Sequence, residues 1–329
     1  MDPLTLIVIV LALLFNFLNG MHDSSNVVAT MISSQAFAPR SALSVAALAN
    51  LAGPFLFGMA VAKTIGEEIV SAQAIDVAVV LAALIGAISW NLLTWYLGIP
   101  SSSSHTLIGG FLGAVVMGAG WGAIRISGLE KVLIALFASP ILGFVVGYVV
   151  LRITLLLCWK ATPRVNSLFR RCQLLTASAL SLSHGTNDAQ KTMGIITLAL
   201  VIGNYLPTFY VPFWVILSCA SMMGLGTALG GWRLIRTLGY KFFKIRPVDG
   251  FTSQLASAVV IVGASVVGGP VSTTQVVSSS IIGVGAAERV NKIRWGVAQE
   301  IAIAWFLTIP ATALIAASTY WLLQRALLF

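Results

Sequence analysis

The stretch Asn19-Gly20-Met21-His22-Asp23-Ser24-Ser25-Asn26 decides how this chain is interpreted, because it places a carboxylate and an imidazole inside otherwise apolar sequence. A variant returns at Ser183-His184-Gly185-Thr186-Asn187-Asp188-Ala189-Gln190-Lys191. Aligning Asp23 with Asp188 gives an offset of 165 residues (188 − 23), about half of the 329-residue chain. A polar motif that recurs at half the chain length indicates an internal duplication.

The composition is that of a membrane protein. Of the residues, 58% are hydrophobic and 9% are charged, and the mean hydropathy is +0.96, whereas a soluble domain carries roughly a quarter charged residues. Long apolar runs favour transmembrane helices and exclude an outer-membrane barrel, whose strands alternate polar and apolar residues. We therefore expect an all-α polytopic membrane protein whose first apolar run is a retained span.

The apolar runs divide the chain into two similar halves. In the first half they cover residues 4–18 (resuming at 27–32 after a helix break at Gly20), 41–62, 77–99, 107–120 and 132–157. In the second half they cover residues 174–202, 211–231, 254–269 and 296–323, with a further run after Gln275. This pattern predicts a first repeat at 1–158, a basic linker at 159–173 and a second repeat at 174–329.

Prolines and hydroxyl residues support the same alignment. Pro100 pairs with Pro270, and Pro140 with Pro310, both at an offset of 170 residues (270 − 100 and 310 − 140). The serines at 102–104 then match the hydroxyl residues at 272–274. A set of matches in consistent order indicates a duplicated unit.

The charged loops predict the orientation of the repeats. Lysines and arginines gather on cytoplasmic loops, which places residues 159–173, 232–249 and 287–295 inside. The net-acidic loop 63–76 then lies outside, and so do both termini. The two repeats are therefore expected to be inverted and to contain broken or re-entrant helices, an arrangement typical of transporters with a substrate site near the midplane.

The prolines at 100 and 270 precede short polar runs that suit an anion. A proline breaks a helix, and the hydroxyls and free backbone N–H groups that follow lie at a helix N-terminus, which favours an oxyanion. Two such termini that point at each other would bind one tetrahedral anion. The alternative is that the small residues only pack helices together, an interpretation that better explains Ser278–Ser280 and the glycines at 109, 110 and 113.

Ionisable groups inside apolar runs are costly and need a reason. They are Asp23, Asp188, Lys191 and the three histidines, His22, His105 and His184. An aspartate suits phosphate, which carries a proton near neutral pH, better than sulfate, which carries none; it also suits a coupling cation or proton. We expect functions for His22 and His105, whereas the simpler interpretation of His184 is that it braces the glycine turn.

At these residues the sequence resembles the PiT family of inorganic phosphate transporters, across essentially the whole chain. That family carries a Gly-Ala-Asn-Asp-type motif in both halves. The second copy here departs only at Thr186, and the first has His22 where asparagine usually stands, as in bacterial members. The resemblance implies a scaffold part that forms a homodimer and a part that binds phosphate between the two serine-rich breaks. The phosphate contacts that we expect are Asp23, Ser102, Ser103, Ser104, His105, Ser272, Thr273 and Thr274.

The coupling ion is expected to be decided where the two motif copies differ. Sodium-coupled relatives tend to have asparagine at the third motif residue and again three residues after the aspartate. Here Asn26 is accompanied by His22, and Asn187 by Lys191. An ammonium can stand where sodium would, and an imidazole can carry a proton near physiological pH; Lys191 alternatively forms a structural ion pair with a nearby aspartate. The expected coupling-ion residues are His22, Asn26, Asn187, Asp188 and Lys191, and proton coupling is favoured over sodium.

The sequence thus predicts a secondary transporter in the inner (plasma) membrane that imports inorganic phosphate by proton symport. Sulfate transport, sodium coupling and an anion channel stay open as alternatives. An enzyme is not expected, because there is no nucleophile–base pair and no nucleotide-binding loop. The three cysteines at 158, 172 and 219 lack metal or disulfide spacing, so we expect neither a metal nor a cofactor, and no basic soluble domain points to nucleic acid.

Overall fold

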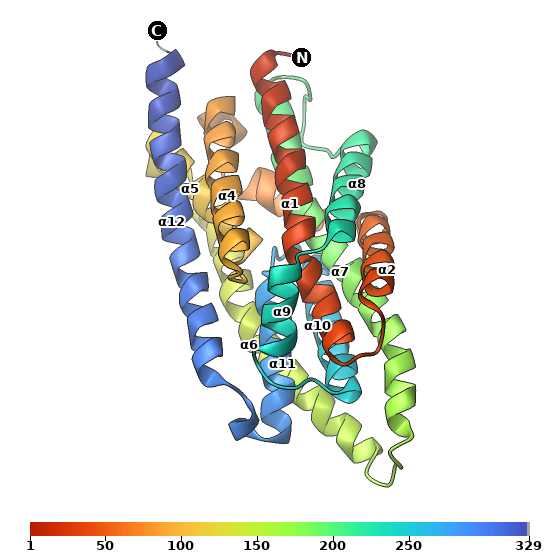
Figure 1. Ribbon diagram of the computed structural model, residues 1–329. Helices are drawn as coiled ribbons and strands as arrows, with labels where there is room; N and C mark the ends of the chain where they lie inside the picture. Colours follow the sequence, from red (N-terminus) through yellow and green to blue (C-terminus); the bar gives the residue numbers. More distant parts are fainter. Residues whose placement is uncertain (328–329) are drawn as a thin grey trace.

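The computed structural model describes residues 1–327, and within them the chain forms twelve α-helices (Figure 1). The first six are α1 (Pro3–Ser33), α2 (Pro39–Ala52), α3 (Ala60–Lys63), α4 (Val77–Leu97), α5 (Ser103–Ala119) and α6 (Ile126–Leu157). The second six are α7 (Val165–Ile202), α8 (Phe213–Leu229), α9 (Trp232–Tyr240), α10 (Pro247–Val266), α11 (Thr273–Glu288) and α12 (Trp295–Leu327). Five of these helices, or seven spans if each bent pair counts as one, are long and apolar enough to cross a membrane.

The two sets of six helices repeat one plan in opposite directions. Helices α1 and α7 carry the polar motifs, and α6 and α12 are long helices with an internal proline. Between them lie two bent pairs, α2–α3 and α8–α9, with bends of 71° and 70°. Figure 1 shows α4 and α5 near the end that holds both termini, whereas α10 and α11 enter from the opposite end. The predicted all-α fold with two inverted repeats is confirmed; the sidedness of the termini stays a prediction.

The predictions of a helix break at Gly20 and of a glycine turn beside His184 were both wrong. α1 runs unbroken through Gly20, and α7 runs unbroken through Gly185. These glycines serve close packing: a side chain at Gly20 would lie 3.2 Å from the Met223 Cα, and one at Gly185 would lie 2.8 Å from the Asn50 Cα. The run predicted as one span at 41–62 is instead bent between α2 and α3.

The predicted breaks at Pro100 and Pro270 are the tips of two re-entrant hairpins, α4–α5 and α10–α11. α4 ends at Gly98 (φ +69°), and Gly268 (φ +73°) follows α10, both in the left-handed region that glycine adopts without strain. The Ser102 and Ser272 hydroxyls then cap α5 and α11 by accepting the backbone N–H of His105 (3.2 Å) and Gln275 (3.3 Å). Each tip therefore presents a capped helix N-terminus to the middle of the molecule.

Small residues hold each hairpin against the other repeat. Side chains at Gly109 and Gly113 in α5 would collide with the backbone of α12, where the nearest atoms include the Ile309 Cα and the Ala313 Cα. A side chain at Gly143 in α6 would lie 3.2 Å from the Val276 Cα in α11. The structure thus supports the packing interpretation for the glycines at 109 and 113.

Candidate anion and coupling-ion site

All thirteen predicted site residues lie in one buried region, where the motifs of α1 and α7 meet the first turns of α5 and α11. None is more than 3% exposed. They are His22, Asp23, Asn26, Ser102, Ser103, Ser104, His105, Asn187, Asp188, Lys191, Ser272, Thr273 and Thr274. Polar groups at this depth are stable only when they are paired or when they bind something.

The Asp23 carboxylate joins the two hairpins. Its Oδ2 accepts the Ser103 hydroxyl of α5 at 3.1 Å, and its Oδ1 accepts the Thr274 hydroxyl of α11 at 3.0 Å. The His22 Nδ1 lies 3.1 Å from the same Oδ1. One carboxylate of the first repeat therefore holds a hydroxyl from each helix N-terminus.

The Asp188 carboxylate repeats part of this arrangement. Its Oδ2 accepts the Thr273 hydroxyl at 2.7 Å, as Asp23 accepts that of Ser103, and the two hydroxyl residues are 170 positions apart (273 − 103). Its Oδ1 accepts the Lys191 ammonium. The duplicated motifs thus bind equivalent hydroxyls but different basic groups.

The Lys191 ammonium is fully engaged by oxygen atoms. Besides Asp188, it donates to the Ser104 hydroxyl at 2.6 Å and to the Val271 carbonyl at 2.8 Å. A carboxylate, a hydroxyl and a carbonyl are the ligand types that hard cations take. The matching position in the first repeat is Asn26 (191 − 165), whose amide donates to the Thr274 hydroxyl at 3.0 Å. The ion pair predicted for Lys191 therefore lies at the position where the sequence also predicted a coupling cation.

His184 belongs to this site, although the sequence placed it elsewhere. Its Nε2 lies 3.0 Å from the Asp188 Oδ2 and 3.8 Å from the Asp23 Oδ2, so the imidazole bridges the two aspartates. Its Nδ1 lies 3.1 Å from the Asn50 Oδ1, and the Asn50 amide donates to the Thr227 hydroxyl at 2.8 Å. The expectation that His184 braces a glycine turn was wrong, because α7 is continuous there. The four-residue spacing from Asp188 would have put both on one face of an unbroken helix.

Gln275 is a second residue that the sequence did not single out. Its Nε2 lies 3.4 Å from the His105 Nε2, and the His105 Nδ1 lies 2.7 Å from the Ser102 hydroxyl. His105 and Gln275 are 170 positions apart (275 − 105), so they are repeat equivalents that meet each other. A constant offset of 170 along both hairpins would have identified this pair.

Several buried polar atoms of the site have no hydrogen-bond partner among residues 1–327. They are the Asn26 Oδ1, the Asn187 Oδ1, the Gln275 Oε1, the His22 Nε2 and the His184 Nε2. A buried polar atom without a hydrogen bond costs about 1–3 kcal/mol. Their gathering around the two aspartates indicates a place built to bind a polar ligand, ion or water.

Inverted repeats whose helical hairpins meet at a buried polar site are typical of membrane transporters. The sequence matches the Phosphate transporter family over residues 19–161 and 158–316, and the chain belongs to this family. The prediction of a transporter rather than an enzyme is therefore confirmed, as is a multi-pass membrane protein.

Named relatives agree over the full length. The chain is 46% identical to a "Probable low-affinity inorganic phosphate transporter" of Bacillus subtilis, over 98% of this chain and 97% of that one. It is also 46% identical to a protein of the same description from Rhizobium meliloti, over 97% and 96% of the two chains. A solved structure described as "The sodium-dependent phosphate transporter" matches with a TM-score of 0.91 at 24% identity, over 98% of this chain and 100% of that one, and supports the fold.

Proposed function

We propose that this chain imports inorganic phosphate across the plasma membrane by proton symport. Its family and the descriptions of its bacterial relatives support phosphate as the substrate. The buried region between the hairpins supports a site for one tetrahedral oxyanion, because two helix N-termini and six hydroxyl residues lie there.

Discrimination between phosphate and sulfate rests on the aspartates. A phosphate that carries a proton donates a hydrogen bond to the Asp23 carboxylate while its other oxygens accept from the hydroxyls of Ser103 and Thr274. Sulfate has no proton to donate and meets only the charge of the carboxylate. The same hydroxyls donate to Asp23 in the structure, so phosphate binding would exchange one acceptor for another rather than require new donors.

The single observation that carries proton coupling is the position of the Lys191 ammonium. It donates to the Ser104 hydroxyl and the Val271 carbonyl, which are oxygen ligands that a sodium ion beside Asp188 would otherwise use. The coupling charge is then left to the two imidazoles that lie beside the aspartates, His22 next to Asp23 and His184 between Asp23 and Asp188.

Sodium coupling is the second candidate. The Asn26 Oδ1 and the Asn187 Oδ1 lack partners within the described chain, and amide oxygens bind sodium readily. The structural relative is described as sodium-dependent, at 24% identity. Lys191 argues against this candidate, because sodium-coupled members tend to have asparagine there.

Reconstitution into proteoliposomes tests the proposal. We expect saturable accumulation of labelled phosphate under an inward proton gradient, no stimulation by a sodium gradient, and no competition by excess sulfate. Uptake driven by sodium and indifferent to pH would overturn proton coupling. Competition by sulfate would indicate a sulfate permease, and non-saturable flux without accumulation would indicate a channel. Liposomes that carry the Asp23→Asn variant are the matched control.

A further inference from the structure

Each hairpin tip is covered by a short helical segment from the opposite repeat. The first cover, residues 60–68, comprises α3 and the π-helical turn Thr64–Glu68 and lies over the α10–α11 tip. The Ala60 carbonyl and the Thr64 hydroxyl are both 3.2 Å from the point where a side chain at Gly268 would begin. The second cover, α9, lies over the α4–α5 tip, where the Thr237 hydroxyl donates to the Gly98 carbonyl at 3.2 Å.

Both covers start at a bend that a motif helix holds. The Gln190 Oε1 of α7 accepts the backbone N–H groups of Val61 (3.0 Å) and Ala62 (3.3 Å) at the start of the first cover. The Ser24 hydroxyl of α1 accepts the Gly231 N–H at 2.8 Å, directly before the second cover. Gln190 adjoins Lys191, and Ser24 adjoins Asp23. The covers are thus joined to the residues that surround the site.

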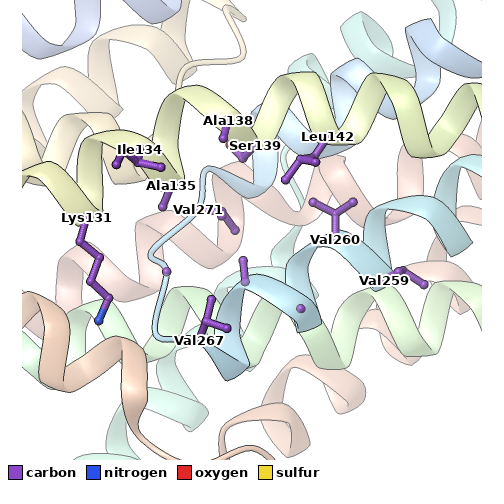
Figure 2. Close-up of a pocket in the computed structure, with 13 residues that line it drawn as sticks. Lys131, Ile134, Ala135, Ala138, Ser139, Leu142, Val259, Val260, Val267 and Val271 are labelled. Carbon is purple, nitrogen blue, oxygen red and sulfur yellow. The ribbon is translucent and has the colours of Figure 1, made fainter.

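The first cover is tied to the long helix beside it. The Lys131 ammonium of α6 donates to the Glu68 carboxylate and to the Thr64 hydroxyl, both at 2.9 Å. Lys131 also lies at one end of a cavity of about 470 Å³ between α6 and α10, in which Figure 2 shows Val267 and Val271 of the hairpin tip. Lys131 therefore connects the first cover to the space behind the tip.

The second cover has a similar cavity without an ion pair. A cavity of about 340 Å³ lies beside the α4–α5 tip and is lined by Glu300 and Ala304 of α12 and by Lys241, which follows α9. Glu300 lies one residue before the position that matches Lys131 at the offset of 170 (301 − 131). In the described part of the chain Glu300 has no ion-pair partner within 4.0 Å, although Lys241 lines the same cavity.

We propose that the two covers are the two gates of the transport cycle, latched by Lys131–Glu68 on one side and by Lys241–Glu300 on the other. The structure has the first gate latched and the second unlatched, and the Lys241–Glu300 pair forms when the second gate closes. This inference rests on the chain being a transporter that opens to the two sides in turn, whatever its anion or coupling ion. One charge of each latch lies on a long helix, Lys131 on α6 and Glu300 on α12, and the other lies on the first cover (Glu68) or directly after the second (Lys241).

Two matched reporters test the gates. Ala135→Cys and Ala304→Cys are made separately in a chain freed of cysteine by Cys158→Ser, Cys172→Ser and Cys219→Ala. The reagent is a maleimide that does not cross membranes, and labelling is measured in proteoliposomes to which the maleimide is supplied on both sides. An exposed ion pair shifts an equilibrium by roughly two- to fivefold. Lys131→Gln should raise labelling at position 135 and lower it at 304 by about that factor.

The second latch has its own test. Lys241→Glu and Glu300→Lys should each slow phosphate uptake and raise labelling at position 304, and the doubly swapped variant should recover both readouts. Lys244→Glu and Glu130→Lys, exposed residues with no ion pair in residues 1–327, are the matched controls. Labelling that changes at both reporters together, or a double swap that stays impaired, overturns the gates. Opposed labelling with no phosphate uptake would keep the gates and overturn the proposed substrate.

Discussion

The two copies of the motif share one pair of equivalent hydroxyls, Ser103 and Thr273, but carry their basic groups in different places. In the first repeat the base is His22, directly before Asp23; in the second it is Lys191, three residues after Asp188. Asp23 with Ser103 and Asp188 with Thr273 are otherwise matched. One hydroxyl partner of each aspartate therefore follows the symmetry of the duplication, whereas the basic groups break it. This difference predicts that substitutions of the aspartates and of the bases separate binding from coupling.

The largest effect is expected from the aspartates, and it should be unequal. Asp188→Asn leaves the Lys191 ammonium buried without a counter-charge, and breaking such a pair costs about 3–5 kcal/mol. Asp23→Asn instead removes the carboxylate beside His22, and an imidazole, unlike the Lys191 ammonium, can be neutral. Both variants should abolish uptake, but Asp188→Asn should also lower the thermal unfolding temperature in detergent much more. The control is Asp76→Asn at the exposed start of α4. Near-normal uptake by both variants would remove the aspartates from the site.

The second test restores the symmetry of the motif. Lys191→Asn should lower sodium-free uptake roughly tenfold or more, because Asp188 loses its cation. Combined with His22→Asn, the chain then has asparagine at all four cation-facing positions, and a sodium gradient should stimulate uptake. Lys191→Arg keeps the charge and is the control. If the double variant stays indifferent to sodium, Lys191 does not stand in for a coupling cation.

His184 bridges the two halves, and its loss should cost less. His184→Gln removes the imidazole that lies 3.0 Å from the Asp188 carboxylate, so it should lower uptake roughly tenfold, about 1.4 kcal/mol, and change its pH dependence. Asn50→Ala removes the partner of the His184 Nδ1, and it should lower uptake by a smaller factor. The measurement is initial uptake rate from pH 5 to 8. An unchanged pH profile with a lowered rate would assign His184 a purely structural role.

The hydroxyl pair should give small and equal effects. Ser103→Ala and Thr273→Val each remove one hydrogen bond, worth about 1 kcal/mol, so each should raise the KM for phosphate by roughly fivefold. Ser278→Ala, in the packing face of α11, should leave it unchanged. Strongly unequal effects of the first two variants would show that the anion lies off the axis that relates the repeats.

The smallest effect is expected at Asp2, which caps α1 and belongs to neither copy of the motif. Hydrogen bonds from Thr5 lower the pKa of Asp2 from its ordinary 3.8 to about 2. Because the pKa of Asp2 is lower in the folded chain than in the unfolded chain, the Asp2 carboxylate stabilises the fold at pH values above its unfolded pKa. This contribution is lost as the pH falls through about 2. Asp2→Asn should therefore leave the pH profile of uptake between 5 and 8 unchanged. A shifted profile would assign part of the pH dependence to this terminus.

Much of the fold could be predicted because, in a membrane protein, the local sequence indicates where helices begin, end and turn. Apolar runs, basic loops and the prolines at 100 and 270 each act on their immediate neighbours, so the spans and both hairpin tips were found in order. The errors have a local cause too. Gly20 was taken as a helix break and Gly185 as a turn. A helix continues through glycine, however, when a neighbouring backbone packs closely against it. That mistake hid the helical spacing between His184 and Asp188.

By itself, the sequence determined the class of protein, the duplication and the buried aspartates, since these depend on composition and on matches at a fixed offset. Only the tertiary structure decided which groups touch. Thr274 reaches Asp23 across 251 positions, Lys191 reaches Ser104 across 87, and His184 lies between two aspartates that belong to different repeats. The physical reason is that a buried charge takes its stability from partners within a few ångströms, and those partners are set by how whole helices pack rather than by residues adjacent in the chain.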